Sequence, residues 1–213
     1  MSHLRIAVPR GALFSQTLDL LDRLGLDTQE VRENDRKLLF EASGIITMRP
    51  SDVPTYVEAG AADLGITGKD VLMEQSEREV YELLDLGYGE CTMVLATTAG
   101  EDRAAEALRR LGVMRIATKY PKIAARHFLD TGRQAEIVEV KGSVELAPLT
   151  GLAEGIVDLT ATGTTLRENG LVIREEIFSS TARLIANPVA HKLRAQAIDR
   201  VVAAARERGS VRV

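Results

Sequence analysis

Short apolar runs alternate with segments of helical periodicity along almost the whole chain. Residues 4–8 predict a buried strand, and residues 12–24 place several leucines on one face of a helix. The alternation continues to Asn187-Pro188, which predicts the start of a single final helix with Leu193 in its apolar stripe. Because strands alternate with helices, we expect an α/β fold with parallel sheets. Further strands are predicted at 45–48, 79–86, 91–97, 115–117, 137–140, 156–157 and 177–186, and further helices from residue 50, at 101–111 with Leu111 inward, and at 121–129.

The sequence also contains an internal repeat. Asp63 is matched 95 positions later by Asp158, with glycines, leucines and threonines around them in register. The strand opening Arg5-Ile6-Ala7 reappears as Arg115-Ile116-Ala117. This self-similarity predicts one α/β design used twice. We expect two Rossmann-like lobes with a cleft between them, lobe I being 1–88 plus 178–213 and lobe II being 89–177.

The stretch after the second copy's strand has the composition of a phosphate-binding loop. Asp158 is predicted at the end of the strand, and the segment 160–165, centred on Gly163, leads into a short helix. A glycine lets successive amides point into one hollow, and threonine hydroxyls add donors without charge. This combination suits a phosphate monoester, while Asp158 suits a ribose diol or a hydrated magnesium ion. The alternative is an ordinary strand–turn–helix connection whose threonines cap the helix.

Composition narrows the class of protein. A net charge of −4 and a pI near 5.5 argue against a nucleic-acid-binding surface. The single cysteine, Cys91, excludes an internal disulfide. Only three histidines are present and they are far apart in sequence, which argues against a metal site made of Cys and His ligands. The N-terminal segment resembles no signal peptide, and no apolar run approaches the ~20 residues that span a bilayer. We therefore expect a cytoplasmic protein.

Six side chains with suitable chemistry fall at predicted strand ends or turns, where open α/β sheets bind ligands. Each of them alone is equally compatible with a solvated loop residue. Their common placement favours a ligand site that faces the predicted cleft. The six are Arg10, Arg36, Arg49, Tyr120, Glu145 and Asp158.

A long motif lies in the second half of the chain: Glu145-x5-Gly151-x-Ala153-x2-Ile156-x-Asp158-Leu159-x2-Thr162-Gly163-x-Thr165-Leu166. It is preceded by Arg36-Lys37-Leu38, Arg49-Pro50-Ser51-Asp52 and Thr118-Lys119-Tyr120-Pro121. These residues resemble the motif of the ATP phosphoribosyltransferase family, which catalyses the first step of histidine biosynthesis. The resemblance extends over nearly the whole chain and corresponds to the family's short form, which lacks a C-terminal regulatory domain. The first loop departs from the family pattern, since Arg10-Gly11-Ala12 has one base where Lys-Gly-Arg is frequent.

The resemblance implies a fold like that of type II periplasmic binding proteins and a reaction of ATP with phosphoribosyl pyrophosphate, with magnesium (Mg2+) present. It implies a homo-oligomer that works with a regulatory subunit similar to a histidyl-tRNA synthetase. Arg36, supported by Arg10, would neutralise the departing pyrophosphate, and Asp158 would bind the ribose directly or through magnesium. The remaining substrate-binding residues would be Thr160, Ala161, Thr162, Gly163, Thr164 and Thr165 for the phosphate, Glu145 for the ribose or magnesium, and Arg49 and Tyr120 for ATP.

Two other classes of function stay open at this point. A ligand-binding or sensor protein would use the same two lobes without chemistry, and pyrophosphate release would distinguish it from the enzyme. A phosphoribosyltransferase of the other large fold group would act on a free base. That group usually carries two adjacent acidic residues before its loop, whereas Val157 precedes Asp158 here.

Overall fold

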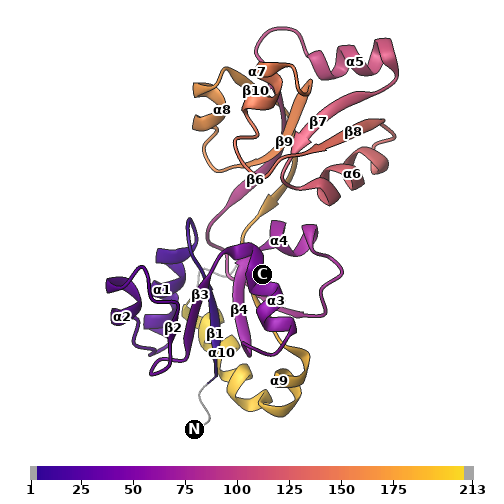
Figure 1. The fold of residues 1–213 in the computed structure, drawn as a ribbon. Coiled ribbons are helices and arrows are strands. Elements are labelled where there is room, and N and C mark those ends of the chain that lie inside the picture. The colour runs from indigo at the N-terminus through magenta and orange to yellow at the C-terminus, as the bar shows by residue number, and fades with distance from the viewer. Residues whose placement is uncertain (1–3, 209–213) are drawn as a thin grey trace. The chain divides into compact units, whose positions relative to one another are not determined.

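The chain forms two compact units in the computed structural model, which describes residues 4–208. Unit 1 comprises Met1–Glu90 and Thr181–Val213, and unit 2 comprises Cys91–Ser180. The chain therefore enters unit 2 once and returns once, as Figure 1 shows. These crossings lie two and three residues after the lobe boundaries suggested by the sequence.

Unit 1 is built on a six-stranded sheet, sheet A, with the strand order β2-β3-β1-β4-β11-β5. Its elements are β1 (Ile6–Pro9), α1 (Phe14–Arg23), α2 (Gln29–Glu33), β2 (Leu39–Phe40), β3 (Ile45–Met48), the 3-10 turn η1 (Pro50–Asp52), α3 (Val53–Glu58), β4 (Leu64–Gly68), α4 (Lys69–Glu74), β5 (Tyr81–Asp85), β11 (Ala182–Ala186), α9 (Pro188–Leu193) and α10 (Ala195–Arg208). β1 pairs in parallel with β3 and β4, so the carboxyl ends of these three strands lie at one edge. β11 is the last strand in the chain, but it lies between β4 and β5 and runs antiparallel to both.

Unit 2 is built on a five-stranded sheet, sheet B, with the order β10-β6-β9-β7-β8. Its elements are β6 (Cys91–Thr98), α5 (Arg103–Leu111), β7 (Met114–Thr118), α6 (Pro121–Asp130), β8 (Ala135–Glu139), α7 (Leu146–Thr150), β9 (Gly155–Thr160), α8 (Thr164–Glu168) and β10 (Leu171–Ser180). β7 pairs in parallel with β8 and β9, whereas β6 runs antiparallel to β9 and to β10.

Both sheets are mixed, so the expectation of parallel sheets is correct for β1, β3 and β4 and for β7, β8 and β9, and wrong for the remaining pairings. β2 turns back antiparallel to β3 within unit 1, and for β6 and β11 the reason is where the chain crosses between the units. β6 begins opposite the carboxyl end of β9, and β11 begins opposite the carboxyl end of β4. Because each entering strand starts at the carboxyl edge of its sheet, it must run antiparallel to the strand beside it.

Each sheet is covered by helices on both faces, because alternate residues of its strands pack into different apolar clusters. In sheet A, Ile6 packs with α1 and α10, whereas Ala7 packs with α3. In sheet B, Val157 packs with α5 and α6, whereas Ile156 packs with α7 and α8. Asp158 follows Val157 and therefore points toward the face that α7 and α8 cover.

Strand pairing supports the internal repeat but corrects its register. Ile6 in β1 pairs with Leu64, whereas its counterpart Ile116 in β7 pairs with Gly155. Leu64 thus corresponds to Gly155, an offset of 91 residues, and the match at 95 was wrong by four positions. The identical dipeptides Asp63-Leu64 and Asp158-Leu159 misled the sequence comparison, because Asp63 precedes β4 whereas Asp158 lies inside β9.

The corrected register pairs two carboxylates that perform the same structural task. Asp63 Oδ2 accepts a hydrogen bond from the N–H of Arg5 at 2.8 Å, and Glu154 Oε2 accepts one from the N–H of Arg115 at 2.6 Å. Each carboxylate thereby joins the end of a helix-to-strand turn to the start of the neighbouring parallel strand. The two units share this device, so we assign Asp63 and Glu154 to folding rather than to chemistry.

We expect Glu154→Gln to lower the free energy of unfolding by about 1–3 kcal/mol at pH 7, because it weakens charge-assisted hydrogen bonds. Burial acts to raise the pKa of Glu154, but hydrogen bonds from Arg115 outweigh it and hold the pKa below the ordinary 4.5. Because folding lowers the pKa of Glu154, its ionised carboxylate stabilises the fold at pH values above the ordinary pKa of 4.5. This contribution is lost as the pH falls through the lowered pKa. Urea unfolding at pH 7 and pH 3 measures the loss, with exposed Glu168→Gln as control. A difference that is equal at both pH values would contradict the prediction.

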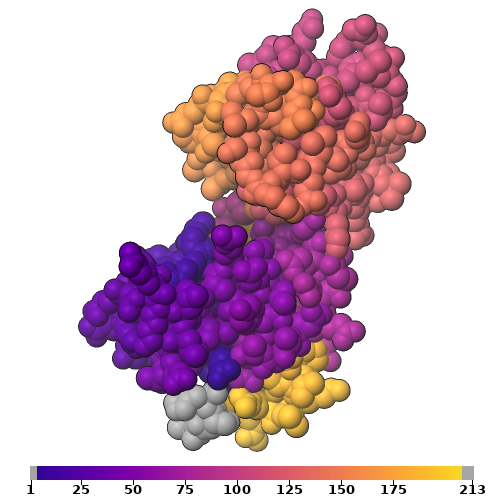
Figure 2. Space-filling model, viewed as in Figure 1, coloured from indigo at the N-terminus to yellow at the C-terminus, as the bar shows by residue number. Residues whose placement is uncertain are grey.

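Two expectations about helix faces are wrong. Leu111 was predicted to face inward, but it is 74 % exposed, and Ala104 instead packs against sheet B. The single final helix is two helices, because Arg194 leaves helical geometry at φ −126° and donates a hydrogen bond to Asp63 at 2.8 Å. The break turns Leu193 outward, where it is 80 % exposed. Figures 1 and 2 show this C-terminal segment in yellow at the surface of unit 1.

Candidate active site

Asp158 is a buried carboxylate near the carboxyl edge of sheet B. It lies inside β9, before the strand's last two residues, and only 6 % of its surface is exposed. Its Oδ1 accepts a hydrogen bond from the N–H of Leu159 at 2.8 Å and lies 3.2 Å from Lys119 Nζ. Burial raises the pKa of Asp158, with a smaller upward contribution from Glu145, and the ammonium of Lys119 only partly offsets the rise. Such a carboxylate is suited to accept hydrogen bonds from the hydroxyls of a ligand.

The loop after β9 is shaped by its own hydroxyls. Thr160 Oγ1 accepts a hydrogen bond from the N–H of Gly163 at 2.8 Å, and the hydroxyls of Thr162 and Thr164 are 2.9 Å apart. Gly163 has a φ of 70° and is the N-cap of α8, so the N-cap residue itself has no side chain to cap the helix. The N–H of Thr164, the first residue of α8, instead donates to Thr162 Oγ1 at 3.4 Å, so capping by threonine accounts for part of the loop. Its exposed members are Ala161, Thr162, Thr164 and Thr165.

Arg167 holds this loop from the outer side. Its Nη1 donates to the carbonyl oxygen of Thr162 at 2.8 Å, and its Nη2 donates to Thr164 Oγ1 at 3.0 Å. A Cβ atom added at Gly163 would lie 2.9 Å from Nη1 of Arg167. The left-handed backbone thus favours glycine at this position, and a Cβ atom would in addition shift the end of the Arg167 side chain.

Two further loops lie at the same edge of sheet B, because they follow the parallel strands β7 and β8. After β7, the N–H of Tyr120 donates to Thr118 Oγ1 at 2.9 Å, and Lys119 Nζ lies 5.5 Å from the centroid of the Tyr120 ring. After β8, Ser143 has a φ of 45°, a rare backbone conformation for a residue other than glycine. Glu145, half-buried, directly precedes α7. Sheet B therefore gathers Asp158, the loop 160–165, Tyr120 and Glu145 at one edge.

Sheet A gathers the predicted arginines at its own carboxyl edge. The guanidinium of Arg10, after β1, is engaged by the fold: Nε donates to Thr47 Oγ1 at 3.0 Å and Nη2 donates to the carbonyl oxygen of Lys37 at 2.9 Å. Arg49, after β3, is exposed and precedes the 3-10 turn. Arg10 thus fixes the segment that carries Arg36, and Arg49 remains available to a ligand.

Arg36 is presented by a tight polar turn. Asn34 Oδ1 accepts hydrogen bonds from the N–H groups of Arg36 and Lys37, at 3.3 and 3.0 Å. The Lys37 ammonium pairs with Glu30 and lies 5.2 Å from the centroid of the Phe40 ring. The side chain of Arg36 is exposed and makes no hydrogen bond or ion pair within residues 4–208. Of these two adjacent bases, only Arg36 is left for an external anion.

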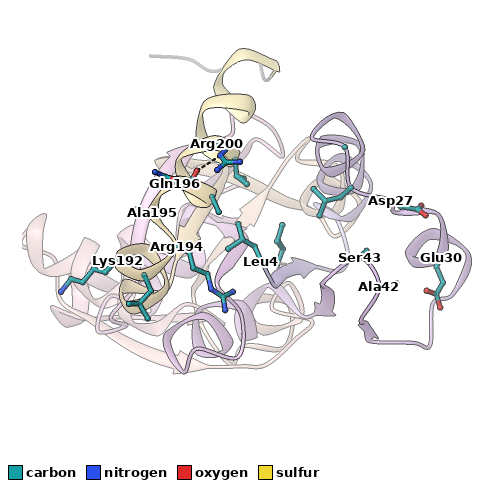
Figure 3. Close-up of a pocket in the computed structure, with 16 residues that line it drawn as sticks. Leu4, Asp27, Glu30, Ala42, Ser43, Lys192, Arg194, Ala195, Gln196 and Arg200 are labelled. Atoms are coloured by element: carbon teal, nitrogen blue, oxygen red, sulfur yellow. Dashed lines mark hydrogen bonds between the residues drawn. The ribbon is translucent and has the colours of Figure 1, made fainter. Parts of the chain in front are cut away.

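A cavity of about 820 Å³ lies elsewhere in unit 1. Figure 3 shows Lys192, Arg194 and Arg200 on one side of it and Asp27 and Glu30 on the other. It also includes residues that precede β1 and β3, so it lies at the amino edge of sheet A. This is the opposite edge from Arg10 and Arg49, and the cavity is separate from the candidate site.

Two residues of the site escaped the sequence-based candidate list. Lys119 pairs with Asp158, and Arg167 clamps the threonine loop. A signal for Lys119 was available, since it lies two residues after the predicted strand 115–117. Arg167 gave no such signal, because its two contacts depend on the turn that Gly163 makes.

No helix within residues 4–208 is long and apolar enough to cross a bilayer. Within the same residues, no group of three or more His, Cys, Asp or Glu side chains could hold a metal ion by itself.

Comparison with known proteins identifies the family. The family model described as ATP phosphoribosyltransferase matches residues 49–207. An ATP phosphoribosyltransferase of Rubrobacter xylanophilus is 56 % identical over 199 residues, which cover 91 % of each chain. A chain of the ATP phosphoribosyl transferase (HisG:HisZ) complex from Thermotoga maritima superimposes with a TM-score of 0.79 at 34 % identity, over 96 % of this chain and 97 % of that one.

The two-lobed fold extends to proteins of distant sequence. A periplasmic binding protein of an arginine transport system from Legionella pneumophila superimposes with a TM-score of 0.61 at 12 % identity, over 96 % of this chain and 92 % of that one. This likeness confirms the expected fold and says nothing about activity. The family match, by contrast, sets aside a sensor without chemistry and a phosphoribosyltransferase of the other fold group. The chain belongs to the ATP phosphoribosyltransferase family, the enzymes of the first step of histidine biosynthesis.

Proposed function

We propose that the threonine loop of unit 2 holds the 5′-phosphate of phosphoribosyl pyrophosphate and that Asp158 binds its ribose hydroxyls. The observation that carries this proposal is the succession of a buried carboxylate and an exposed loop kept open by its own hydroxyls. Hydroxyl and amide donors can bind a phosphate without the excess positive charge that this acidic chain lacks. The loop residues concerned are Thr160, Ala161, Thr162, Gly163, Thr164 and Thr165, and Glu145 is a weaker candidate for the ribose.

The reaction places few demands on acids and bases. N1 of the ATP adenine attacks C1 of the ribose, and the bond from C1 to pyrophosphate breaks, so that pyrophosphate leaves with the electron pair. The products are N1-(5-phosphoribosyl)-ATP and pyrophosphate. Catalysis then consists mainly of aligning the two substrates and neutralising the charge that develops on the leaving group.

We assign the neutralising role to unit 1. The side chain of Arg36 is exposed and unpaired within residues 4–208, so its guanidinium is free to bind an anionic group. Arg10 supports it through the hydrogen bond to the carbonyl oxygen of Lys37, next to Arg36. Arg49 and Tyr120 are proposed to place ATP. An arginine suits pyrophosphate because its planar guanidinium can donate two parallel hydrogen bonds.

Members of this family generally need a divalent metal. We propose that the metal here is magnesium, bound mainly by the substrate. Magnesium is usually held through one or two carboxylates together with substrate phosphates. A single buried carboxylate, Asp158, fits that pattern, and the described residues offer no complete metal cage. When bound, the ion would supply further charge neutralisation to the pyrophosphate.

We also propose a partner protein. The Thermotoga maritima relative was solved as a HisG:HisZ complex, and this chain covers 97 % of that relative's chain. We infer that this protein is a homo-oligomer that assembles with a regulatory subunit resembling histidyl-tRNA synthetase, in the cytoplasm. Turnover of the purified chain with and without that subunit tests the assembly.

We expect Gly163→Ala to weaken binding of phosphoribosyl pyrophosphate by at least about 10-fold. The added Cβ would displace Arg167 and break its hydrogen bonds to Thr162 and Thr164, so the loop would lose its shape. The matched control is Gly170→Ala, because Gly170 has nearly the same φ, 69°, but nothing within 4 Å of the added Cβ. Both variants share a backbone penalty of about 1–2 kcal/mol. Calorimetric titration measures the affinity, and equal dissociation constants for the two variants would argue against the phosphate loop.

A further inference from the structure

Lys119 and Asp158 form an ion pair that this fold does not require. Lys119 directly follows β7, and Asp158 lies in β9, each one residue beyond the paired residues Thr118 and Val157. In unit 1, β1 and β4 pair at Ala7 and Gly65, and the same register continued by two residues gives Pro9 and Thr67 as the corresponding positions. There the Thr67 hydroxyl donates to the carbonyl oxygen of Pro50 at 2.8 Å. These two positions in unit 1 therefore carry an uncharged hydrogen bond in place of an ion pair.

Within this ion pair, the lysine faces the solvent, the side from which a ligand approaches. The Asp158 side chain is 9 % exposed, whereas the Lys119 side chain is 40 % exposed. The ammonium thus lies between a buried carboxylate and the solvent, close to the ring of Tyr120. A pair of this kind contributes little to stability, because desolvation of the charges offsets their attraction. Its presence in one unit alone therefore favours a role in substrate binding.

We propose that Lys119 is a positioning residue for the ribose of phosphoribosyl pyrophosphate. This inference rests on the proposed function of Asp158. The ammonium holds the Asp158 carboxylate in the orientation that receives the ribose hydroxyls. It also screens the carboxylate's negative charge from the phosphate and pyrophosphate groups, which would otherwise be repelled at this short range.

The first test separates binding of the two substrates. For Lys119→Met we expect KM for phosphoribosyl pyrophosphate to rise about 10- to 100-fold while KM for ATP changes less than about threefold. Lys119→Arg should restore most of the affinity, because it keeps the positive charge next to the carboxylate. Lys122→Met, an exposed lysine at the start of the same helix α6, is the matched control and should behave as the wild type. Equal rises in both KM values would overturn the inference.

The second test asks whether Lys119 acts through Asp158. If it does, the double variant Lys119→Met/Asp158→Asn binds phosphoribosyl pyrophosphate no more weakly than Asp158→Asn alone. Additive losses would show that Lys119 acts elsewhere and would overturn the inference. An unchanged affinity in Asp158→Asn would refute the proposed function itself. Impaired Asp158→Asn beside a normal Lys119→Met would refute only the role of Lys119. Thermal unfolding of each variant verifies that it is folded.

Discussion

Replacing Arg36 by alanine is expected to lower kcat by about 10²- to 10³-fold at saturating substrates, equivalent to about 2.7–4 kcal/mol of barrier. The reason is that Arg36 is the exposed base, without a partner in residues 4–208, that the turn at Asn34 directs away from the fold. Its charge is proposed to act on pyrophosphate as the bond to C1 breaks, so the loss should appear in turnover more than in substrate affinity. Steady-state kinetics of pyrophosphate release provide the measurement.

The neighbouring lysine provides a matched control for Arg36. Lys37 carries the same charge one residue later, but its ammonium is engaged by Glu30 and by the face of Phe40. Lys37→Ala should therefore reduce stability slightly and leave kcat within about threefold of the wild type. If Arg36→Ala also changes kcat by less than about threefold, which is under ~0.7 kcal/mol, then Arg36 does not neutralise the leaving group.

Asp158→Asn is expected to lower kcat/KM for phosphoribosyl pyrophosphate by about 100-fold, or about 2.7 kcal/mol. Asparagine has nearly the same shape, but its amide is a weaker acceptor for ribose hydroxyls than a carboxylate, and it would no longer pair with Lys119. The exposed carboxylate of Asp130, on α6, offers a control at Asp130→Asn. Unaltered kinetics in Asp158→Asn would contradict the assignment of Asp158 to the substrate.

The stability of the Asp158→Asn variant should move in the opposite direction from its activity. The pKa of Asp158 is raised chiefly by burial, so the carboxyl favours folding when protonated, and that contribution is lost as the pH rises through the raised pKa. At pH 7 the ionised side chain therefore opposes folding, and asparagine removes this penalty. We expect chemical denaturation at pH 7 to show a free energy of unfolding at least equal to that of the wild type. A large loss of stability would instead mark Asp158 as a structural residue.

The sequence predicted the parallel core of each sheet and the place of the threonine loop. Apolar runs such as 4–8 lie in strands buried on both faces, so the pattern is strong and local. Gly163 could be recognised because its neighbours are small and hydroxyl-bearing, and the structure gives it the left-handed φ that such a turn requires. Local chemistry was therefore a reliable guide to local geometry.

What the sequence could not predict depends on contacts between distant residues. The break at Arg194 depends on Asp63, which lies far earlier in the chain, and nothing in the apolar stripe marks it. The register of the repeat required strand pairing, because chance identity at Asp-Leu was stronger than the true correspondence of Asp63 with Glu154. The family resemblance singled out Arg36 over Lys37, but the physical difference between them, that Glu30 and Phe40 engage only Lys37, came from the structure.

The position of β11 has a consequence for how the protein forms during synthesis. Unit 2 is continuous in sequence, so a nascent chain that has emerged as far as Ser180 already contains all of it. Unit 1 at that moment has β4 and β5 but lacks the strand that lies between them. Sheet A closes only when Ala182–Ala186 leaves the ribosome and inserts. Unit 1, whose translation begins first, is therefore the unit that finishes folding last.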